Sequence, residues 1–479
     1  MSNNRIKFIL NSTVKEVDFN TSNFRPSTTV LNYLRSFNDT KGVKEGCAEG
    51  DCGACSIVIG ELTENNSIRY YSVDSCLLFL ASIHGKQIIT IEGLERKLEN
   101  RTVLHPVQQA LIDHFGSQCG FCTPGIVMSI FALYKSNAYP NRNDVVQNLS
   151  GNLCRCTGYE PILNAALEVC SNLQPDHFDA NEKNVVKILE EIKRKQASVI
   201  ATAKSQVYHL PETLQEALEI KESNPTVKVV NGATDTAIRQ NKFHEYIEEI
   251  LDISNVSEVK LLSKQGNGFY IGAGVTIEAL KTFAKKNIPT ILPMLEVFAS
   301  HQIRNVATIG GNLATASPIG DLIPLLMAHS ARVELVSSNE SRWVEVQEFI
   351  TGYRKNCLKS NELIKGILIP KVDENVTIKS EKVSTRHQLD ISTVSLSARI
   401  EFEMEAVKSI ILAFGGMAEV PKRALKTEAF LHGKTFNRET IEKAMEKISD
   451  DFTPISDARA SAEYRLVAAK NLLLKLISG

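Results

Sequence analysis

The familiar signatures of hydrolytic and nucleotide chemistry are absent from this sequence of 479 residues. It contains no G-x-S-x-G nucleophile turn, no H-E-x-x-H zinc motif and no P-loop. Its histidines include His84, His105, His209, His301 and His387, and none of these has a metal-binding partner four residues further on. The sequence therefore favours chemistry carried by bound cofactors over chemistry carried by a catalytic triad or dyad.

The chain also lacks an excess of charge, a membrane-spanning run and an export signal. Its formal net charge is -1, which argues against a nucleic-acid partner. No apolar run approaches the roughly 20 residues that cross a membrane. The N-terminal segment MSNNRIKFILNSTVKEVDF alternates like a strand and has no apolar signal core or cleavage site. We therefore expect a cytoplasmic protein that uses neither membrane nor nucleic acid.

Cysteine, by contrast, is concentrated in one part of the chain. Eight of the ten cysteines fall within residues 47–156. Disulfide scaffolds are short, secreted and cysteine-dense, so metal binding in a reducing compartment is the better interpretation. The other two, Cys170 and Cys357, fit neither of the sets described below, and we assign them no role.

The first set of cysteines is Cys47, Cys52, Cys55 and Cys76. The spacing is C-x4-C-x2-C, followed by twenty residues and the fourth cysteine, which is the pattern of a plant-type [2Fe–2S] ferredoxin. Glycines at 46, 50 and 53 would let the loop wrap closely around a cluster. A four-cysteine zinc knuckle is the alternative, although zinc sites usually pair two C-x2-C units.

The second set comprises Cys119 and Cys122 in QCGFCTP and Cys154 and Cys156 in LCRCTGYEP. Each pair is expected to follow one helix (102–116 or 142–151) and to lead into another, so that 102–173 resembles an internal duplication. In the helix that follows the first pair, Thr123 is expected to be the N-cap and Pro124 the first residue. Helix N-termini favour an anionic cluster, and Arg155 would offset part of its charge. Structural zinc is again the alternative.

Beyond the cysteines the composition changes twice. Residues 174–205 are charged and have few apolar anchors, which predicts a partly helical linker or a solvated helical hairpin. From Tyr208 a new domain alternates strands and helices. The segment VKVVNGATDTAIRQ reads as strand, tight turn and helix, and such a turn is suited to a phosphate. Many α/β proteins contain a turn of this kind without a ligand.

A second candidate cradle lies at 293–328. Gly310 and Gly311 permit close backbone approach, and polar side chains at Asn312, Thr315 and Ser317 interrupt an apolar stretch. A polar-capped core helix would explain any one of these residues, but their density favours a dinucleotide site. The absence of G-x-G-x-x-G indicates that the site is not of the Rossmann type.

Together, GCAEGDCGAC, QCGFCTPG and GNLCRCTGYEPI resemble the iron–sulfur part of the molybdenum hydroxylases, a family that includes xanthine dehydrogenases, aldehyde oxidases and aerobic carbon monoxide dehydrogenases. The resemblance implies a multidomain α+β fold. The expected parts are a β-grasp ferredoxin domain (1–90), a four-helix [2Fe–2S] domain (91–173), a linker (174–205), an FAD-binding α/β domain like that of carbon monoxide dehydrogenase flavoproteins (206–375) and a C-terminal α+β domain (376–479).

The same resemblance implies individual contacts. Gln118 and Cys156 match positions that approach the pterin, and Tyr353, Arg386 and Asp390 match the nicotinamide side of the flavin. Ala233 stands where the family usually has a second glycine, Gln388 where many relatives have an acidic residue, and Leu389 is atypical for a polar loop. The matched FAD positions are Val230, Asn231, Gly232, Ala233, Thr234, Asp235, Thr236, Ala237, Phe298, Thr308, Gly310, Gly311, Asn312, Thr315, Ser317, Asp321, Ile364 and Lys382.

The implied function is electron transfer in a xanthine dehydrogenase-type enzyme. Electrons from a purine would pass from a molybdopterin centre on a separate larger subunit through two [2Fe–2S] clusters to FAD and then to NAD. We expect a dimer of heterodimers. Two alternatives remain open at this point: a molybdenum hydroxylase acting on an aldehyde or N-heterocycle with another acceptor, and a non-enzymatic scaffold stabilised by zinc.

Overall fold

The computed structural model describes residues 4–98, 101–136, 139–196 and 198–477. The ends of the first and last expected domains (1–3 and 478–479), four residues of the expected helical domain (99–100 and 137–138) and residue 197 of the expected linker lie outside them. The chain forms two compact units. The first unit is Met1–Ala217, Val227–Asn255 and Ser300–Ala307, and the second unit is Leu218–Thr226, Val256–Ala299 and Thr308–Gly479.

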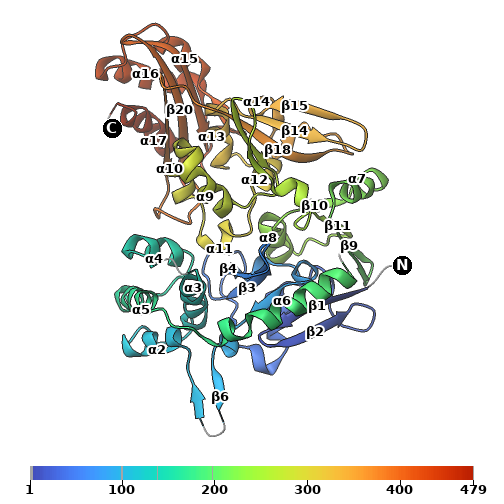
Figure 1. Ribbon diagram of the computed structural model, residues 1–479. Coiled ribbons are helices and arrows are strands. Elements are labelled where there is room, and N and C mark those ends of the chain that lie inside the picture. The colour runs from blue at the N-terminus through green and yellow to red at the C-terminus, as the bar shows by residue number, and fades with distance from the viewer. Residues whose placement is uncertain (1–3, 99–100, 137–138, 197, 478–479) are drawn as a thin grey trace. The chain divides into compact units, whose positions relative to one another are not determined.

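The first unit begins with a five-stranded sheet of order β2-β1-β5-β3-β4, drawn in blue in Figure 1. Its strands are β1 (Arg5–Leu10), β2 (Thr13–Asp18), β3 (Ser56–Leu62), β4 (Ile68–Asp74) and β5 (Gln87–Ile89). β1 runs antiparallel to β2 and parallel to β5. With α1 (Val30–Arg35) packed beside it, this mixed sheet is the predicted β-grasp. Of the two cysteine-bearing segments of this domain, residues 47–55 precede β3 and Cys76 follows β4.

Four helices follow in the predicted order: α2 (Pro106–Asp113), α3 (Thr123–Lys135), α4 (Arg142–Leu149) and α5 (Glu160–Ser171). Every residue of α3 from Gly125 to Tyr134 is buried, so α3 is the central helix of this group. Two details of the prediction were wrong. The segment Arg101–Val103 is strand β7, paired with β6 (Arg96–Leu98), because the helix starts only at its N-cap His105. Cys122, not Thr123, is the N-cap of α3.

The predicted linker is mostly one long helix, α6 (His177–Lys195). Our expectation of few apolar anchors was wrong, because Val185, Leu189 and Ile192 form a buried stripe that packs with Ile9 and Ile68 of the first sheet. This spacing of four and three residues is the signature of an amphipathic helix, hidden in the sequence by the many charges between the anchors.

The first unit also contains a four-stranded sheet of order β10-β11-β9-β8. The strands are β8 (Val199–Ala203), β9 (Gln206–Leu210), β10 (Lys228–Val230) and β11 (Glu249–Asp252), of which β10, β11 and β9 are parallel. α7 (Leu214–Ser223) and α8 (Thr234–Phe243) connect them, so the predicted strand, turn and helix at 227–240 are confirmed. The short helix α11 (His301–Arg304) completes this unit.

The second unit contains two antiparallel sheets. One has the order β12-β13-β18-β14-β15, and the other has the order β19-β20-β21-β22. The strands are β12 (Leu262–Lys264), β13 (Gly268–Gly272), β14 (Arg332–Val336), β15 (Ser341–Glu345), β18 (Leu363–Pro370), β19 (Val376–Val383), β20 (Val394–Glu403), β21 (Ala406–Gly415) and β22 (Lys422–Arg423), with a small ribbon of β16 (Ile350–Gly352) and β17 (Lys355–Asn356).

Between the strands of the first sheet, the chain forms helices α9 (Ile277–Asn287), α10 (Leu292–Val297), α12 (Ile309–Ala314), α13 (Leu322–Ala328) and α14 (Val346–Phe349). Of these, α13 contacts β20 and β21 of the second sheet. The C-terminal helices α15 (Leu425–Leu431), α16 (Arg438–Asp451) and α17 (Ala462–Lys475) share a core with β20 and β21 (Figure 1). The predicted α+β character of the C-terminal region is confirmed. Across the described part of the chain, no helix combines the length and apolarity needed to traverse a lipid bilayer.

Candidate functional site

The first cysteine set lies on the loop before β3 and on the short 3-10 turn Ser75–Leu77. Within it the thiols contact one another in pairs, Cys47 with Cys52 and Cys55 with Cys76. The loop aims backbone N–H groups at sulfur: Cys47 donates to Cys52 Sγ at 3.3 Å, and Asp51 donates to Cys47 Sγ at 3.2 Å. Such donors stabilise thiolate and cluster sulfur alike.

Two glycines of this loop confirm the expected need for close approach. A Cβ at Gly46 would lie 2.6 Å from Cys52 Sγ. Gly50 has a φ of +83°, and a Cβ there would lie 2.7 Å from the Leu77 side chain. A larger residue at either position would displace the loop from the sulfur atoms that it surrounds.

The protonation pattern of the first set is strongly polarised. Contact with the Cys52 thiol, together with backbone N–H donors, lowers the pKa of Cys47 to about 5. Contact with Cys76 and complete burial raise the pKa of Cys55 well above its usual value. Burial, followed by the nearby Cys47, raises the pKa of the Asp74 carboxyl to about 8. The four thiols and this carboxyl thus lie close enough to influence one another's protonation.

The second cysteine set pairs crosswise between its two motifs. Cys119 contacts Cys156, and Cys122 contacts Cys154. Cys119 and Cys156 are exposed, Cys122 is half-buried and Cys154 is buried. The set therefore has an inner pair within the helical group and an outer pair at the surface.

Two side chains hold the inner end of this set. The Thr157 hydroxyl lies 3.2 Å from Cys154 Sγ, and the Tyr159 hydroxyl accepts a hydrogen bond of 2.9 Å from the Cys154 N–H. Burial raises the pKa of Cys154, but hydrogen bonds from Thr157 outweigh this effect, and the pKa lies below its usual value. Tyr159 reaches this position with a φ of +70°, which is rare for a bulky residue. Sequence reasoning missed the Tyr159 contact, and the only available signal was its place in CRCTGY.

The two cysteine sets adjoin each other within the first unit. The Leu153 N–H donates to the Cys52 carbonyl at 3.0 Å, which joins a residue next to Cys154 directly to a cysteine of the first set. Asn152 Nδ2 donates to the Gly53 carbonyl at 3.1 Å, and Gln302 Nε2 donates to Asn152 Oδ1 at 2.7 Å. A Cβ at Gly125 would lie 2.1 Å from the Gly53 carbonyl oxygen, so the two backbones touch.

The cysteines of each set thus form two contacting pairs. In the described residues, no group of three or more His, Cys, Asp or Glu side chains is placed to hold one metal ion. Two ligand pairs with sulfur-directed N–H donors fit a two-iron cluster, in which four cysteines serve two irons. The residues present therefore fit the predicted clusters, with Cys47, Cys52, Cys55 and Cys76 as one ligand set and Cys119, Cys122, Cys154 and Cys156 as the other.

The expected FAD positions divide between the units. In the first unit, Val230 ends β10, and the turn Asn231–Ala233 leads into α8. Gly232 has a φ of +76°, and a Cβ there would lie 1.9 Å from the Val306 carbonyl oxygen. Asn231 Nδ2 is buried and has no hydrogen-bond partner. An orphaned buried donor in a glycine-bearing turn at a helix N-terminus fits a bound anion.

α8 also connects this turn with the first cysteine set. From the last part of the helix, Asn241 Nδ2 donates to the carbonyls of Cys76 at 2.8 Å and Ala48 at 3.0 Å. The nearby Lys242 pairs with Glu49 at 3.6 Å. Sequence reasoning did not identify Asn241, because nothing in the pattern of α8 indicates which loop it touches.

In the second unit, the expected FAD loop forms α12. Thr308 is its N-cap and accepts from the Gly311 N–H at 3.1 Å. A Cβ at Gly310 would lie 2.5 Å from the Ala273 side chain, so this glycine allows α12 to pack closely against the turn after β13. Asn312 Oδ1 is buried and has no partner, which leaves an acceptor for a bound group. Thr315 donates to the Asn312 carbonyl, at 2.8 Å.

Asp321 and Lys382 come together as a buried ion pair, with 2.9 Å between Lys382 Nζ and Asp321 Oδ2. Lys382 also donates to the Val297 carbonyl at 3.3 Å, next to the expected FAD residue Phe298, and Ser392 donates to Asp321. Ile364 is buried in β18. Of the expected residues, Asp321 and Lys382 are thus joined directly, and Phe298 adjoins them through Val297.

The expected nicotinamide-side residues are more exposed. Tyr353 is 59% exposed. Arg386 and Asp390 pair with each other, since Arg386 N and Nε donate to the two Asp390 oxygens at 2.8 and 2.7 Å. Between them Leu389 adopts a φ of +73°, so the loop is closed on itself in a conformation unusual for leucine. Gln118, the expected pterin-facing residue, is exposed beside Cys119.

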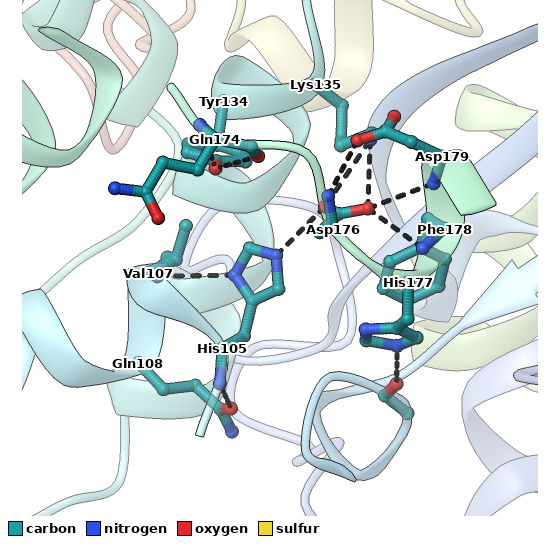
Figure 2. A network of polar contacts seen from close by, with 11 residues as sticks. His105, Val107, Gln108, Tyr134, Lys135, Gln174, Asp176, His177, Phe178 and Asp179 are labelled. Carbon is teal, nitrogen blue, oxygen red and sulfur yellow. Dashed lines mark hydrogen bonds and ion pairs between the residues drawn. The ribbon is translucent and has the colours of Figure 1, made fainter. Parts of the chain in front are cut away.

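A separate polar network holds α6 against the helical group (Figure 2). Asp176 caps α6 by accepting from the N–H groups of Phe178 and Asp179, and it also pairs with Lys135 at 3.2 Å. The Val107 N–H donates to His105 Nδ1, so His105 carries its proton on Nε2 and donates it to Asp176 at 3.0 Å. Contact with His105 and Lys135 outweighs burial and holds the pKa of Asp176 below its usual range. This network carries no candidate chemistry.

Family models, related sequences and solved structures all show similarity between this chain and molybdenum-dependent oxidoreductases. Three family models match: "[2Fe-2S] binding domain" over 90–167, "FAD binding domain in molybdopterin dehydrogenase" over 200–372 and "CO dehydrogenase flavoprotein C-terminal domain" over 379–478. The xanthine dehydrogenase of Drosophila subobscura is 31% identical across 94% of this chain, and that of Emericella nidulans is 32% identical across 93%. The chain spans 37% and 36% of these relatives, little more than a third of their length.

Solved structures show a related fold over part of the chain. Quinoline 2-oxidoreductase from Pseudomonas putida 86 aligns with a TM-score of 0.53 and 25% identity, covering 56% of this chain and 94% of that one. A carbon monoxide dehydrogenase from Hydrogenophaga pseudoflava aligns with a TM-score of 0.53 and 24% identity, covering 56% of this chain and 93% of that one.

Proposed function

We propose that this chain is the electron-transfer subunit of a molybdenum hydroxylase oxidising hypoxanthine or xanthine, because it is similar to xanthine dehydrogenases across 94% of its length and matches iron–sulfur and flavin family models. Electrons would pass from a molybdopterin centre on a partner chain through two [2Fe–2S] clusters to FAD and then to NAD. The observation that carries this proposal is the pair of adjoining four-cysteine sites, each built from two contacting thiol pairs.

The arrangement of the first unit supports a continuous route. The outer pair Cys119 and Cys156 is exposed, whereas Cys154 is buried next to Leu153, which hydrogen-bonds to Cys52. From the first set, Cys76 is joined through Asn241 to α8 and so to the turn at Gly232. Within the first unit, the two cysteine sets and the turn at Gly232 are thus linked by protein contacts.

When bound, the flavin would supply the change between two-electron and one-electron chemistry, and the clusters would carry single electrons. The residues of this chain hold and orient these groups. Backbone N–H groups of Cys47 and Asp51 would donate to sulfur at the first cluster. In the first unit, Asn231 would provide a donor to a phosphate group. In the second unit, Asn312 would provide an acceptor to a bound group, and burial of Ile364 and of the Asp321–Lys382 pair would exclude water there.

The partner would dock where the outer pair of the second set reaches the surface. Around it lie exposed aromatic side chains, Phe115 (83% exposed) and Phe121 (48% exposed), next to Gln118. Exposed aromatic groups of this kind are typical of protein interfaces. We propose that this face binds the molybdopterin-bearing large subunit, in a cytoplasmic dimer of heterodimers.

Spectroscopy tests the cofactors first. Purified protein should show visible absorption from flavin and [2Fe–2S] that dithionite bleaches, about four irons per chain, and two distinct EPR signals on reduction. A colourless protein with stoichiometric zinc would overturn the proposal in favour of a scaffold. The substrate is then tested by purifying the chain with its partner and assaying NADH formation from xanthine.

One feature favours a second candidate function, a hydroxylase of another N-heterocycle or an aldehyde that uses a different acceptor. The Arg386–Asp390 loop is closed by its own ion pair, and Gln388 and Leu389 replace polar or acidic residues expected beside NAD. Reduction of a dye by xanthine without NADH formation would favour a different acceptor, and inactivity with purines but turnover of quinoline or an aldehyde would favour the different substrate.

A further inference from the structure

One lysine belongs to both cysteine loops. The Lys44 N–H donates to the carbonyl of Ala54, between Cys52 and Cys55, at 3.1 Å. Its Nζ donates to the carbonyls of Gly120 at 3.0 Å and Phe121 at 3.3 Å, the two residues between Cys119 and Cys122. Lys44 itself precedes Cys47 by three residues. A single side chain therefore spans from the ferredoxin-like loop to the loop of the second set.

The charge on Lys44 is held by uncharged groups. Besides the two carbonyls, its Nζ lies 5.5 Å from the centre of the Phe121 ring, in a cation–π contact. The residue is half-buried, so solvent screens it less than it screens a fully extended surface lysine. These partners keep the ammonium in place and carry no formal negative charge, so they do not neutralise it.

Reduction of a [2Fe–2S] cluster adds one negative charge to it, and its potential depends on nearby charge and hydrogen bonds. A fixed cation next to the loop of Cys119 and Cys122 therefore stabilises the reduced form of the second cluster. The same cation also ties that loop to the first one, which opposes any change in the spacing of the two sites.

We propose that Lys44 is a positioning residue that clamps the two cluster loops together and raises the reduction potential of the helical cluster. This inference rests on the proposed function, because it requires both clusters to be bound. It goes beyond that function by assigning to one side chain, outside both ligand sets, a role in setting the driving force between the two centres.

The test compares four variants of the full chain with the wild type. Lys44→Met removes charge and donor, Lys44→Gln keeps an amide donor without the charge, and Lys44→Arg keeps the charge. Lys41→Met is the matched control, because Lys41 is exposed in the same segment. Each protein is titrated with dithionite while the two cluster EPR signals are followed against potential.

We expect Lys44→Met and Lys44→Gln to shift the midpoint potential of the helical cluster to more negative values, and more than that of the first cluster. Lys44→Arg and Lys41→Met should stay close to the wild type. A helical cluster whose potential is unchanged in both neutral variants would overturn the inference. So would an equal shift in Lys44→Arg, since loss of packing and not of charge would then be the cause.

The outcomes also separate this inference from the function on which it rests. If the wild type shows no pair of [2Fe–2S] signals, the proposed function fails. If both signals are present and the neutral variants do not move them, only the role of Lys44 fails. Should Lys44→Met not fold, Lys44→Gln still isolates the charge, because it is close in length and can still donate to a carbonyl.

Discussion

Ala233 occupies a backbone conformation that costs an L-amino acid energy. Its φ of 56° and ψ of 10° are left-handed, immediately before α8 in the turn proposed to bind the flavin phosphates. Alanine pays roughly 1–2 kcal/mol for this conformation, whereas glycine adopts it freely. The turn can form because the preceding residue is Gly232, at which any side chain would collide with the Val306 carbonyl.

We predict that Ala233→Gly stabilises the protein by about 1 kcal/mol, because it removes the left-handed strain. Chemical denaturation of the flavin-free protein measures this directly. The gain should be smaller than the full strain, since glycine also makes the unfolded chain more flexible. A variant clearly less stable than the wild type would show that the Ala233 methyl group contributes to packing.

A second residue-scale prediction concerns His329 in the second unit. It is buried, donates from Nδ1 to the Leu325 carbonyl at 2.8 Å and lies 2.9 Å from the Thr290 hydroxyl through Nε2. Burial lowers the pKa of His329 to about 4. Between this value and its ordinary 6.5, the unfolded chain binds a proton that the folded chain does not.

The contribution of neutral, buried His329 to the free energy of unfolding is therefore fully present above pH 6.5 and is lost as the pH falls towards 4. At about 1.4 kcal/mol per pKa unit, roughly 3 kcal/mol is at stake. Urea unfolding between pH 7.5 and 4.5 should show this loss in the wild type and a flatter profile in His329→Gln. Equal pH dependence in the two proteins would assign acid instability to other groups.

At the scale of the element, α6 depends on Asp176, which serves at once as helix cap and as partner of His105 and Lys135 (Figure 2). The Asp176 and Lys135 side chains are 5% and 7% exposed, so water can solvate little of either charge if the ion pair is broken. Removing one partner of such a pair is more costly than removing a surface charge.

We predict that Asp176→Asn lowers the free energy of unfolding by about 2–4 kcal/mol. Asparagine can still cap the helix, so the loss should come from the buried pairing of Asp176 with Lys135 and His105, although Lys135 keeps its second partner, Asp179. Asp179→Asn is the control, because the Asp179 side chain is 49% exposed and its loss should cost under about 1 kcal/mol. Similar losses in the two variants would mean that the capping box, and not burial of charge, stabilises α6.

The junction of α3 with the first cysteine loop gives the next prediction. Alanine normally stabilises a helix interior relative to glycine. At Gly125 the added methyl would lie 2.1 Å from the Gly53 carbonyl oxygen. We therefore predict that Gly125→Ala destabilises the protein by about 1–3 kcal/mol and lowers iron content when measured after purification.

Gly352→Ala is a useful comparison, since its methyl would meet only the Lys355 side chain at 3.8 Å. It should leave both stability and iron unchanged. If Gly125→Ala behaves in the same way, the contact between the backbones of the two cysteine regions is not needed for cluster binding.

On the scale of the whole molecule, most of the elements could be predicted from apolar periodicity and turn residues. The strand, turn and helix around Gly232 and the helices that flank the cysteine pairs are clear in the sequence. The packing of α6 was not predicted because its three apolar anchors are separated by many charged residues. Their partners, Ile9 and Ile68, are distant in the sequence. The strand at Arg101–Val103 depends on a partner that a local pattern does not reveal.

The candidate site shows the same division. Spacing grouped the eight cysteines into two sets, but did not indicate that Cys119 contacts Cys156 and Cys122 contacts Cys154, because this crosswise contact arises from the packing of four helices. Lys44, Asn241 and Tyr159 escaped notice for a related reason. Each acts through a contact with a backbone atom, and such contacts leave no characteristic spacing in a single sequence.

Each unit has hydrophobic clusters of its own, such as that around Phe131 in the first unit and that around Phe414 in the second. We therefore predict two separable thermal transitions in the protein with bound clusters. Removal of iron with a chelator should lower only the transition of the first unit, because a bound group stabilises only the part that holds it. A single transition that moves as a whole on iron removal would contradict this expectation.

The contact of α8 with two separate loops has a further consequence. Thr234 at the phosphate turn and Asn241 at the Cys76 carbonyl are seven residues apart on one helix, a rise of about 10 Å. Because electron tunnelling falls steeply with distance, α8 would set the separation between the proposed phosphate turn and the first cysteine set. Inserting one residue would lengthen it by only about 1.5 Å but turn Asn241 through about 100°. A change in the length of α8 would therefore break the Asn241 contacts, even if every other side chain of the helix were kept.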